Sequence, residues 1–168
     1  MGRAVYSLKT ETDADFWEVE ALFDLCFAPG REALSSYRLR DGVPKVAELS
    51  LVARDAEGVL AGAIRYWPVR VGPAPAVLLG PIAVHPTRQG EGLGGVLIRD
   101  SLALARDHPL SGNRVLLVGD APYYSRFGFA RLADVIMPPP TNPARVLGRA
   151  LVTGAWTGVV GEVTRALP

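Results

Sequence analysis

The stretch that decides the fold is "HPTRQGEGLGG", residues 85–95, which has four glycines in its last six positions. It follows "AVLLGPIAV", residues 76–84, whose continuous hydrophobicity is typical of a strand buried on both faces. Downstream, the apolar residues of "GLGGVLIRDSLALARDH", residues 92–108, recur at helical spacing. The glycines therefore lie at a strand-to-helix junction, where the backbone comes close to a ligand or turns tightly.

Four interpretations compete for this loop: a dinucleotide site, a P-loop, an anion-binding helix start and a turn without a ligand. Gly90, Gly92 and Gly95 satisfy G-x-G-x-x-G, but the polar "HPTRQ" separates them from the strand, unlike in a dinucleotide fingerprint. No Gly-Lys-Ser/Thr follows, which argues against a P-loop. Without a ligand, glycines in a first helical turn cost up to about 1 kcal/mol each relative to alanine. Anion binding by the N–H groups of residues 90–95 explains the pattern best.

Length and composition indicate one globular domain over residues 1–168, with 49% hydrophobic and 21% charged residues. The formal net charge of +1 and the lack of basic runs argue against nucleic-acid binding. The single cysteine, Cys26, excludes an internal disulfide. No signal peptide and no membrane-spanning stretch is evident, so we expect a cytoplasmic protein that does not bind membranes.

The remaining chain predicts a mixed α/β (α+β) fold. The proline-rich segment "MPPPTNP", residues 137–143, predicts a loop, and two strands joined by a turn that is rich in Gly and Thr are expected after it. The expected elements before it are a strand at 3–8, a helix from Thr12 or Asp13 to Cys26, a weaker helix at 32–39, a hairpin of 49–54 and 59–71, a strand at 114–120 and a short helix within 121–129.

The glycine loop resembles a known motif. Gln89-Gly90-Glu91-Gly92-Leu93-Gly94 matches Q/R-x-x-G-x-G/A, the pyrophosphate-binding motif of the GNAT N-acetyltransferases. "LLGPIAVHP" upstream is similar to the fourth strand of that superfamily, and "APYYSRFGF" downstream to its tyrosine-containing short helix. The whole set resembles the YhbS-like branch, strongly over residues 79–129, in layout before that and loosely after 138.

The resemblance implies a GNAT fold, with a mostly antiparallel mixed sheet splayed between strands 4 and 5 and helices on both faces. Residues 1–75 would form the N-terminal part, 76–130 the cofactor-binding core and 138–168 the C-terminal strands. Acetyl-CoA would be the cosubstrate, with no metal. Its binding residues would be Ile82, Ala83, Val84, Arg88, Gln89, Gly90, Glu91, Gly92, Leu93, Gly94, Gly95 and Arg126.

The resemblance also implies direct attack of a primary amine on the thioester, with an N–H near Ile82 stabilising the oxyanion. Tyr124 would be the general acid, since a phenol with a pKa near 10 is protonated at neutral pH. Tyr123 is its rival for that role. Arg126 would meet a coenzyme A phosphate or lie in solvent. No nucleophile motif is evident, and Cys26 fits a packing role.

No general base follows from the sequence. His85 would shape a turn, and Asp120 would cap the next helix or orient a water. The amine would lose its proton through water or arrive neutral.

The acceptor is not identified by the sequence. Arg38, Arg40, Tyr66, Trp67 and Trp156 are candidate lining or structural residues, and "VTGAWTG", residues 152–158, would close over the acceptor or form a homodimer contact. Two other functions stay open, a non-catalytic acyl-CoA sensor and a dinucleotide-binding oxidoreductase.

Overall fold

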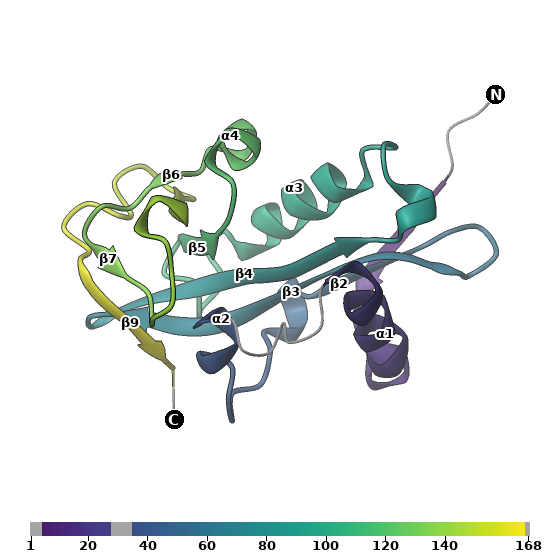
Figure 1. Cartoon of the computed structure of the whole chain (residues 1–168), viewed down its shortest axis with the longest axis horizontal. Helices are drawn as coiled ribbons and strands as arrows, with labels where there is room; N and C mark the ends of the chain where they lie inside the picture. The colour runs from purple at the N-terminus through teal and green to yellow at the C-terminus, as the bar shows by residue number, and fades with distance from the viewer. Residues whose placement is uncertain (1–4, 28–34, 167–168) are drawn as a thin grey trace.

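The computed structural model describes residues 5–27 and 35–166. Its elements follow the expected order, with short 3-10 turns between them (Figure 1). The helices are α1 (Phe16–Cys26), α2 (Ser35–Arg38), α3 (Leu93–Ala105) and α4 (Ala121–Tyr124). The strands are β1 (Ser7–Thr10), β2 (Leu51–Arg54), β3 (Leu60–Val71), β4 (Ala74–Val84), β5 (Arg114–Val118), β6 (Ala130–Arg131), β7 (Val135–Ile136), β8 (Val146–Ala150) and β9 (Gly161–Arg165).

The described strands form one twisted sheet in the order β1-β2-β3-β4-β5-β8-β6. β9 pairs with the C-terminal end of β3, residues 69–71, and β7 pairs with β9. The β4–β5 and β7–β9 pairings are parallel and the others antiparallel, as the mixed fold requires. The long β3–β4 hairpin is the centre of this sheet (Figure 1).

The sheet is splayed between β4 and β5, as predicted. The two strands pair only at Val77↔Val115 and Leu78↔Leu116, although β4 continues for six more residues to Val84. Beyond these pairs, the slot-facing edges of both strands keep backbone groups free of each other. An opening therefore lies within the sheet itself.

Helices cover both faces of the sheet. Side chains alternate between the two faces along each strand, so each face has apolar residues that pack against a helix. Leu51, Ala61 and Tyr66 pack with α3 in one cluster, whereas Val52 and Ala63 pack with α1 in another. Thr12 begins the N-terminal helical segment, and its backbone N–H donates to Asp15 Oδ2 at 2.8 Å. None of the described helices is long and apolar enough to cross a membrane.

The prediction for the C-terminal strands is wrong in their pairing. β8 and β9 exist, but they do not form a hairpin with each other. β8 pairs with β5 and β6, whereas β9 pairs with β3 and β7. Alternating residues predict a strand, but the free sheet edge that it joins is decided by the tertiary fold.

Smaller differences concern boundaries. β1 begins at Ser7 rather than near residue 3, and residues 1–4 lie outside the described part. The helix expected at 32–39 is present as α2, and residues 32–34 are likewise outside. β6 and β7, with two residues each, were not expected, because two residues carry no periodic signal.

Candidate active site

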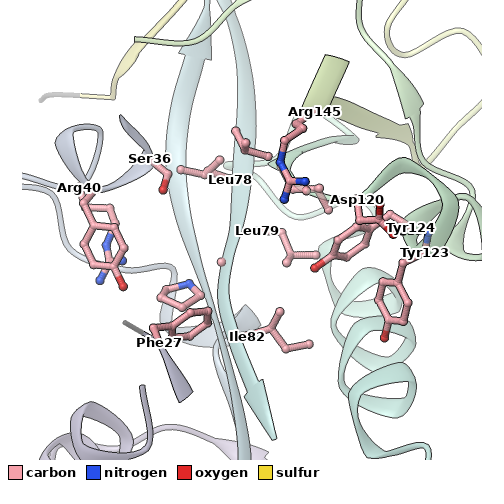
Figure 2. Close-up of a pocket in the computed structure, with 16 residues that line it drawn as sticks. Phe27, Ser36, Arg40, Leu78, Leu79, Ile82, Asp120, Tyr123, Tyr124 and Arg145 are labelled. Carbon is pink, nitrogen blue, oxygen red and sulfur yellow. Dashed lines mark hydrogen bonds between the residues drawn. The ribbon is translucent and has the colours of Figure 1, made fainter. Parts of the chain in front are cut away.

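A cavity of about 540 Å³ lies at the slot where β4 and β5 diverge (Figure 2). Leu79 and Ile82 line it from β4, and Leu117 and Val118 from β5. Figure 2 shows Tyr124 on one side of these strands and Arg40 on the other. The cavity therefore runs from the α4 side of the sheet to the α2 side.

The backbone of β4 presents alternate residues to the slot. The N–H of His85 donates to the carbonyl of Ala61 at 2.8 Å, so His85 and Ala83 direct their backbone groups at β3. Ile82 and Val84 consequently direct theirs away from β3, towards β5. The carbonyl of Val84 accepts from Gln89 Nε2 at 3.2 Å. A ligand that pairs with this edge of β4 as an added strand would therefore hydrogen-bond with the backbone of Ile82.

The glycine loop forms a cradle at the start of α3. Gly90 and Gly92 have φ of +86° and +81°, the left-handed region, and a Cβ on either would meet no protein atom within 4 Å. The N–H groups of Leu93, Gly94 and Gly95 open the helix and have no partner within it. A second cavity, of about 560 Å³, lies over these glycines. Its geometry suits an anion at the helix N-terminus.

Polar side chains fix the loop against the rest of the fold. Arg88 donates to the carboxylate of Asp55 through Nη2, and its Nη1 lies 3.4 Å from the hydroxyl of Tyr6. Tyr6 in turn donates to Glu91 Oε2 at 2.9 Å. Backbone N–H donors, chiefly that of Val59, and Arg88 lower the pKa of Asp55. These contacts link the cradle to β1 and to the β2–β3 turn.

Tyr124 faces the slot from α4, whose N-cap is Asp120. Asp120 Oδ2 accepts from the backbone N–H of Tyr123 at 3.2 Å, which confirms its capping role. Figure 2 shows the Tyr124 side chain pointing from α4 towards β4. Burial, which is the largest cause, raises the pKa of Tyr124 to about 12. The phenol is therefore protonated throughout the physiological range.

Tyr123 takes a different position. A Cβ built on Gly94 would lie 3.6 Å from the Tyr123 hydroxyl, so this ring reaches the first turn of α3. Tyr123 lines both the slot cavity and the cradle cavity. The two cavities therefore meet at this side chain.

Most of the predicted cofactor residues come together around these two cavities. Two do not: Ala83 packs into the α1 cluster, and Glu91 is turned to Tyr6. The others lie along the cavity walls, namely Ile82 in the slot and Val84, Arg88, Gln89, Gly90, Gly92, Leu93, Gly94, Gly95 and Arg126 at the cradle.

Other sequence interpretations are confirmed by packing. His85 shapes the turn after β4, with Nδ1 accepting from the Thr87 N–H at 3.2 Å. Cys26 packs in the α1 cluster, where burial raises the pKa of its thiol.

A third cavity, of about 420 Å³, was missed from the sequence and contains four arginines. Arg99 comes from α3, Arg106 directly follows α3, Arg126 comes from the turn after α4 and Arg149 from β8. It adjoins the cradle, since Arg99 and Arg126 line both cavities. The available signal was the seven-residue spacing of Arg99 and Arg106, about two helical turns, which predicts that both lie on the same side of the segment.

On the α2 side, the described cavity wall includes Ser36, Tyr37 and Arg40, whereas Arg145 lines it from the side of Tyr124 (Figure 2). Of the five candidate acceptor residues, only Arg40 lines the cavity. The Arg38 guanidinium donates to the carbonyl of Pro139, the Tyr66 hydroxyl is buried against Ser101, and the Trp67 indole donates to Gly80. Trp156 packs against the cluster that includes Val163 of β9 and does not line the cavity. The loop at 152–158 contributes no residue to the described wall either.

Comparison with known proteins agrees with this geometry. A family model described as the acetyltransferase (GNAT) family matches residues 16–129. Among curated protein sequences, none matches this chain significantly.

Solved structures match at higher coverage. A GNAT family N-acetyltransferase (YhbS) from Escherichia coli, in complex with CoA, is 30% identical with a TM-score of 0.79, covering 97% of this chain and 89% of that one. A GNAT family acetyltransferase from Brucella melitensis, in complex with acetyl-CoA, is 32% identical with a TM-score of 0.61, covering 82% of this chain and 94% of that one.

Proposed function

The chain belongs to the GNAT acetyltransferase family, and on that premise we propose that it transfers the acetyl group of acetyl-CoA directly to a primary amine. The observation that carries this proposal is the continuity of three features: the glycine cradle, the slot between β4 and β5, and Tyr124 at the slot. Both relatives described above are complexes with CoA or acetyl-CoA. A dinucleotide-binding oxidoreductase has no support from this family.

In the proposed complex the pyrophosphate lies on the cradle. The N–H groups that open α3 donate to it, and the left-handed Gly90 and Gly92 let it approach without a Cβ in the way. Arg99 and Arg126 have guanidinium groups at the same cavity, stacked over Phe127 and Tyr123 respectively. They add positive charge to the cradle, whereas the charge of Arg88 is partly neutralised by its ion pair with Asp55.

The four-arginine cavity is the proposed place for the 3′-phosphate of coenzyme A. It adjoins the cradle on the side away from the slot, and its described wall includes no Asp or Glu. Arg149 is held by its own hydrogen bond to the carbonyl of Phe127, so Arg106 has the freer side chain. A phosphate ester there would meet guanidinium groups from two directions.

The pantetheine arm then enters the slot as an added strand. The backbone groups of Ile82 point into the slot, which supports pairing with the arm and places an N–H donor near the thioester carbonyl. The amine enters from the α2 side and attacks the carbonyl carbon, so that an N–C bond forms and the C–S bond breaks. Tyr124 donates its phenolic proton to the leaving sulfur, the nitrogen releases its surplus proton to solvent as the amide forms, and Tyr124 regains a proton from solvent.

The amine has to be neutral to attack. The described wall of the slot has Asp120 as its only carboxylate, and that carboxylate caps α4. We therefore propose that the amine loses its proton to water before attack, without a dedicated base.

The test combines binding and turnover. Millimolar coenzyme A should raise the melting temperature, and free thiol should appear from acetyl-CoA when a suitable amine is added. Protection without thiol release across a broad amine panel would instead indicate an acyl-CoA sensor. An unchanged melting temperature would contradict both.

A further inference from the structure

The wall of the slot cavity carries an excess of positive charge. Three charged side chains line its described wall, those of Arg40, Asp120 and Arg145. Asp120 accepts a backbone N–H of α4, so its charge is already partly matched. In Figure 2, Arg40 and Arg145 lie on either side of the β4 residues that line the cavity. The cavity therefore has one guanidinium group on its α2 side, that of Arg40, and one on the side of Tyr124, that of Arg145.

Arg40 is held rigidly, and its polar edge remains available. Its guanidinium lies 3.8 Å from the ring centre of Tyr37 and 4.2 Å from that of Trp67. Trp67 is itself fixed, since its indole N–H donates to the carbonyl of Gly80 at 2.7 Å. Stacking occupies the faces of a guanidinium and leaves the N–H groups in its plane. One of these groups of Arg40 hydrogen-bonds to the Tyr37 side chain, and the others remain for a ligand. In the described part of the chain no carboxylate forms an ion pair with Arg40.

Arg145 approaches from the end of a 3-10 turn, residues Pro143–Arg145, that adjoins β8. Its backbone is fixed, because its carbonyl accepts from the N–H of Gly119 and its own N–H donates to Asn142, both at 2.9 Å. Its side chain is exposed and makes no ion pair within residues 5–27 and 35–166. Its charge is close enough to Tyr124 to favour the phenolate of that residue. Arg145 thus lies near the reacting end of the slot.

We propose that this site selects acceptors whose primary amine is accompanied by an anionic group, a carboxylate or a phosphate, which binds one of these two guanidinium groups. The inference rests on the proposed function, since it names the acceptor class for the same site. Planar guanidinium groups bind carboxylate and phosphate through paired hydrogen bonds. The same positive charge repels polyamines and other polycations.

The experiment compares acceptors that share an amine and differ in the anion. O-phosphoethanolamine against ethanolamine tests the phosphate, and a series of free amino acids against their amides tests the carboxylate. Putrescine serves as the cationic acceptor. We expect kcat/KM, measured by thiol release at saturating acetyl-CoA, to be about tenfold to a hundredfold higher for the anionic member of at least one pair.

Variants connect the preference to the arginines. Arg145→Gln should reduce the preference about tenfold, mainly through KM, and Arg145→Lys should restore part of it. Arg40→Gln should act in the same direction. Arg131→Gln is the matched control, because Arg131 is exposed on β6 and does not line the slot cavity. Unchanged protection by coenzyme A would show that each variant remains folded.

Calorimetric titration of O-phosphoethanolamine and of the amino acids into the coenzyme A-loaded protein separates the two proposals. Binding that Arg145→Gln weakens supports the anionic subsite even if no amine is acetylated, in which case only the proposed transfer fails. Acetylation of ethanolamine, the amides or putrescine at equal or higher kcat/KM overturns the acceptor class and leaves the transfer intact. A preference that persists in both arginine variants also overturns it.

Discussion

Tyr124 packs directly against the backbone of Gly119, so closely that a Cβ on Gly119 would lie 2.5 Å from Cε2 of the ring. Gly119 follows β5, and its N–H donates to Arg145, so the surface under the ring is fixed by the sheet. The position of the Tyr124 phenol at the slot therefore requires a glycine, which has no side chain, at residue 119. It depends little on hydrogen bonds of the phenol itself, for which the described residues give none.

This packing makes Tyr124→Phe a direct test of the acid. Phenylalanine keeps the ring on Gly119 and removes only the hydroxyl. We expect kcat to fall about a hundredfold or more, because a positioned general acid contributes at least that factor, whereas protection by coenzyme A is unchanged. Tyr123→Phe is the control, and its kcat should change little. An equal loss of kcat in that variant would contradict the assignment of the general acid to Tyr124.

The pH dependence of kcat follows from the same residue. Burial raises the pKa of Tyr124 to about 12, so the phenol stays protonated up to pH 10. The raised pKa contributes stability that is fully present below the unfolded value near 10 and is lost as pH rises through about 12. We expect no descending limb between pH 7 and 10 in kcat profiles. A limb near pH 10 that disappears in Tyr124→Phe would contradict this.

Gly92→Ala tests the cradle. Gly92 and Gly158 have similar φ, +81° and +75°, and a Cβ on either meets no protein atom within 4 Å. Both alanine variants should lose about 1 kcal/mol of unfolding free energy, from left-handed strain alone. Only Gly92→Ala should also weaken coenzyme A binding, measured by calorimetry, because its Cβ would project into the cradle. Equal affinities in the two variants would remove the cradle from the proposed site.

Arg106→Ala tests the four-arginine cavity. We expect about tenfold weaker binding of coenzyme A, since a charge-assisted hydrogen bond to a phosphate contributes about 1.5–3 kcal/mol. Binding of dephospho-coenzyme A, which lacks the 3′-phosphate, should be unaffected. Both affinities are measured by calorimetry on the same preparation. A loss that is equal for the two ligands would place the phosphate elsewhere.

Stability depends on a buried ion pair on the α1 side of the sheet. Arg65 donates to both carboxylate oxygens of Glu11 at 2.9 Å, and their side chains are 3% and 0% exposed. Glu11→Gln removes the charge of the bidentate partner and leaves Glu20, whose carboxylate accepts from Arg65 at 2.5 Å, so the unfolding free energy should fall by about 1–3 kcal/mol. Urea denaturation measures it. Glu57→Gln, on the exposed β2–β3 turn, is the control and should change it little.

The sequence predicts the central elements of the fold because their signals are local. The apolar stripe of α1, the turn between β2 and β3 and the glycines before α3 are each contained within a few residues. Tyr124 and the cradle glycines followed from a motif with fixed spacing. Their roles in catalysis and binding stay predictions that the variants above test.

Long-range relationships were not predictable in the same way. Arg40 and Arg145 are separated by more than a hundred residues, and no periodicity connects them. β8 and β9 were expected to pair because they are neighbours in sequence, but β8 pairs with β5 and β9 pairs with β3. Such pairings depend on the assembled sheet, which no short segment encodes.

The two-residue ladder between β4 and β5 has a consequence beyond catalysis. Under the proposed function the cosubstrate supplies the strand that this sheet lacks, so it acts as a component of the fold as well as a reactant. A ligand at a hundred times its Kd adds about 2.7 kcal/mol to the unfolding free energy. The resistance of this protein to proteases, and hence its abundance in a cell, would then follow the metabolic supply of acetyl-CoA.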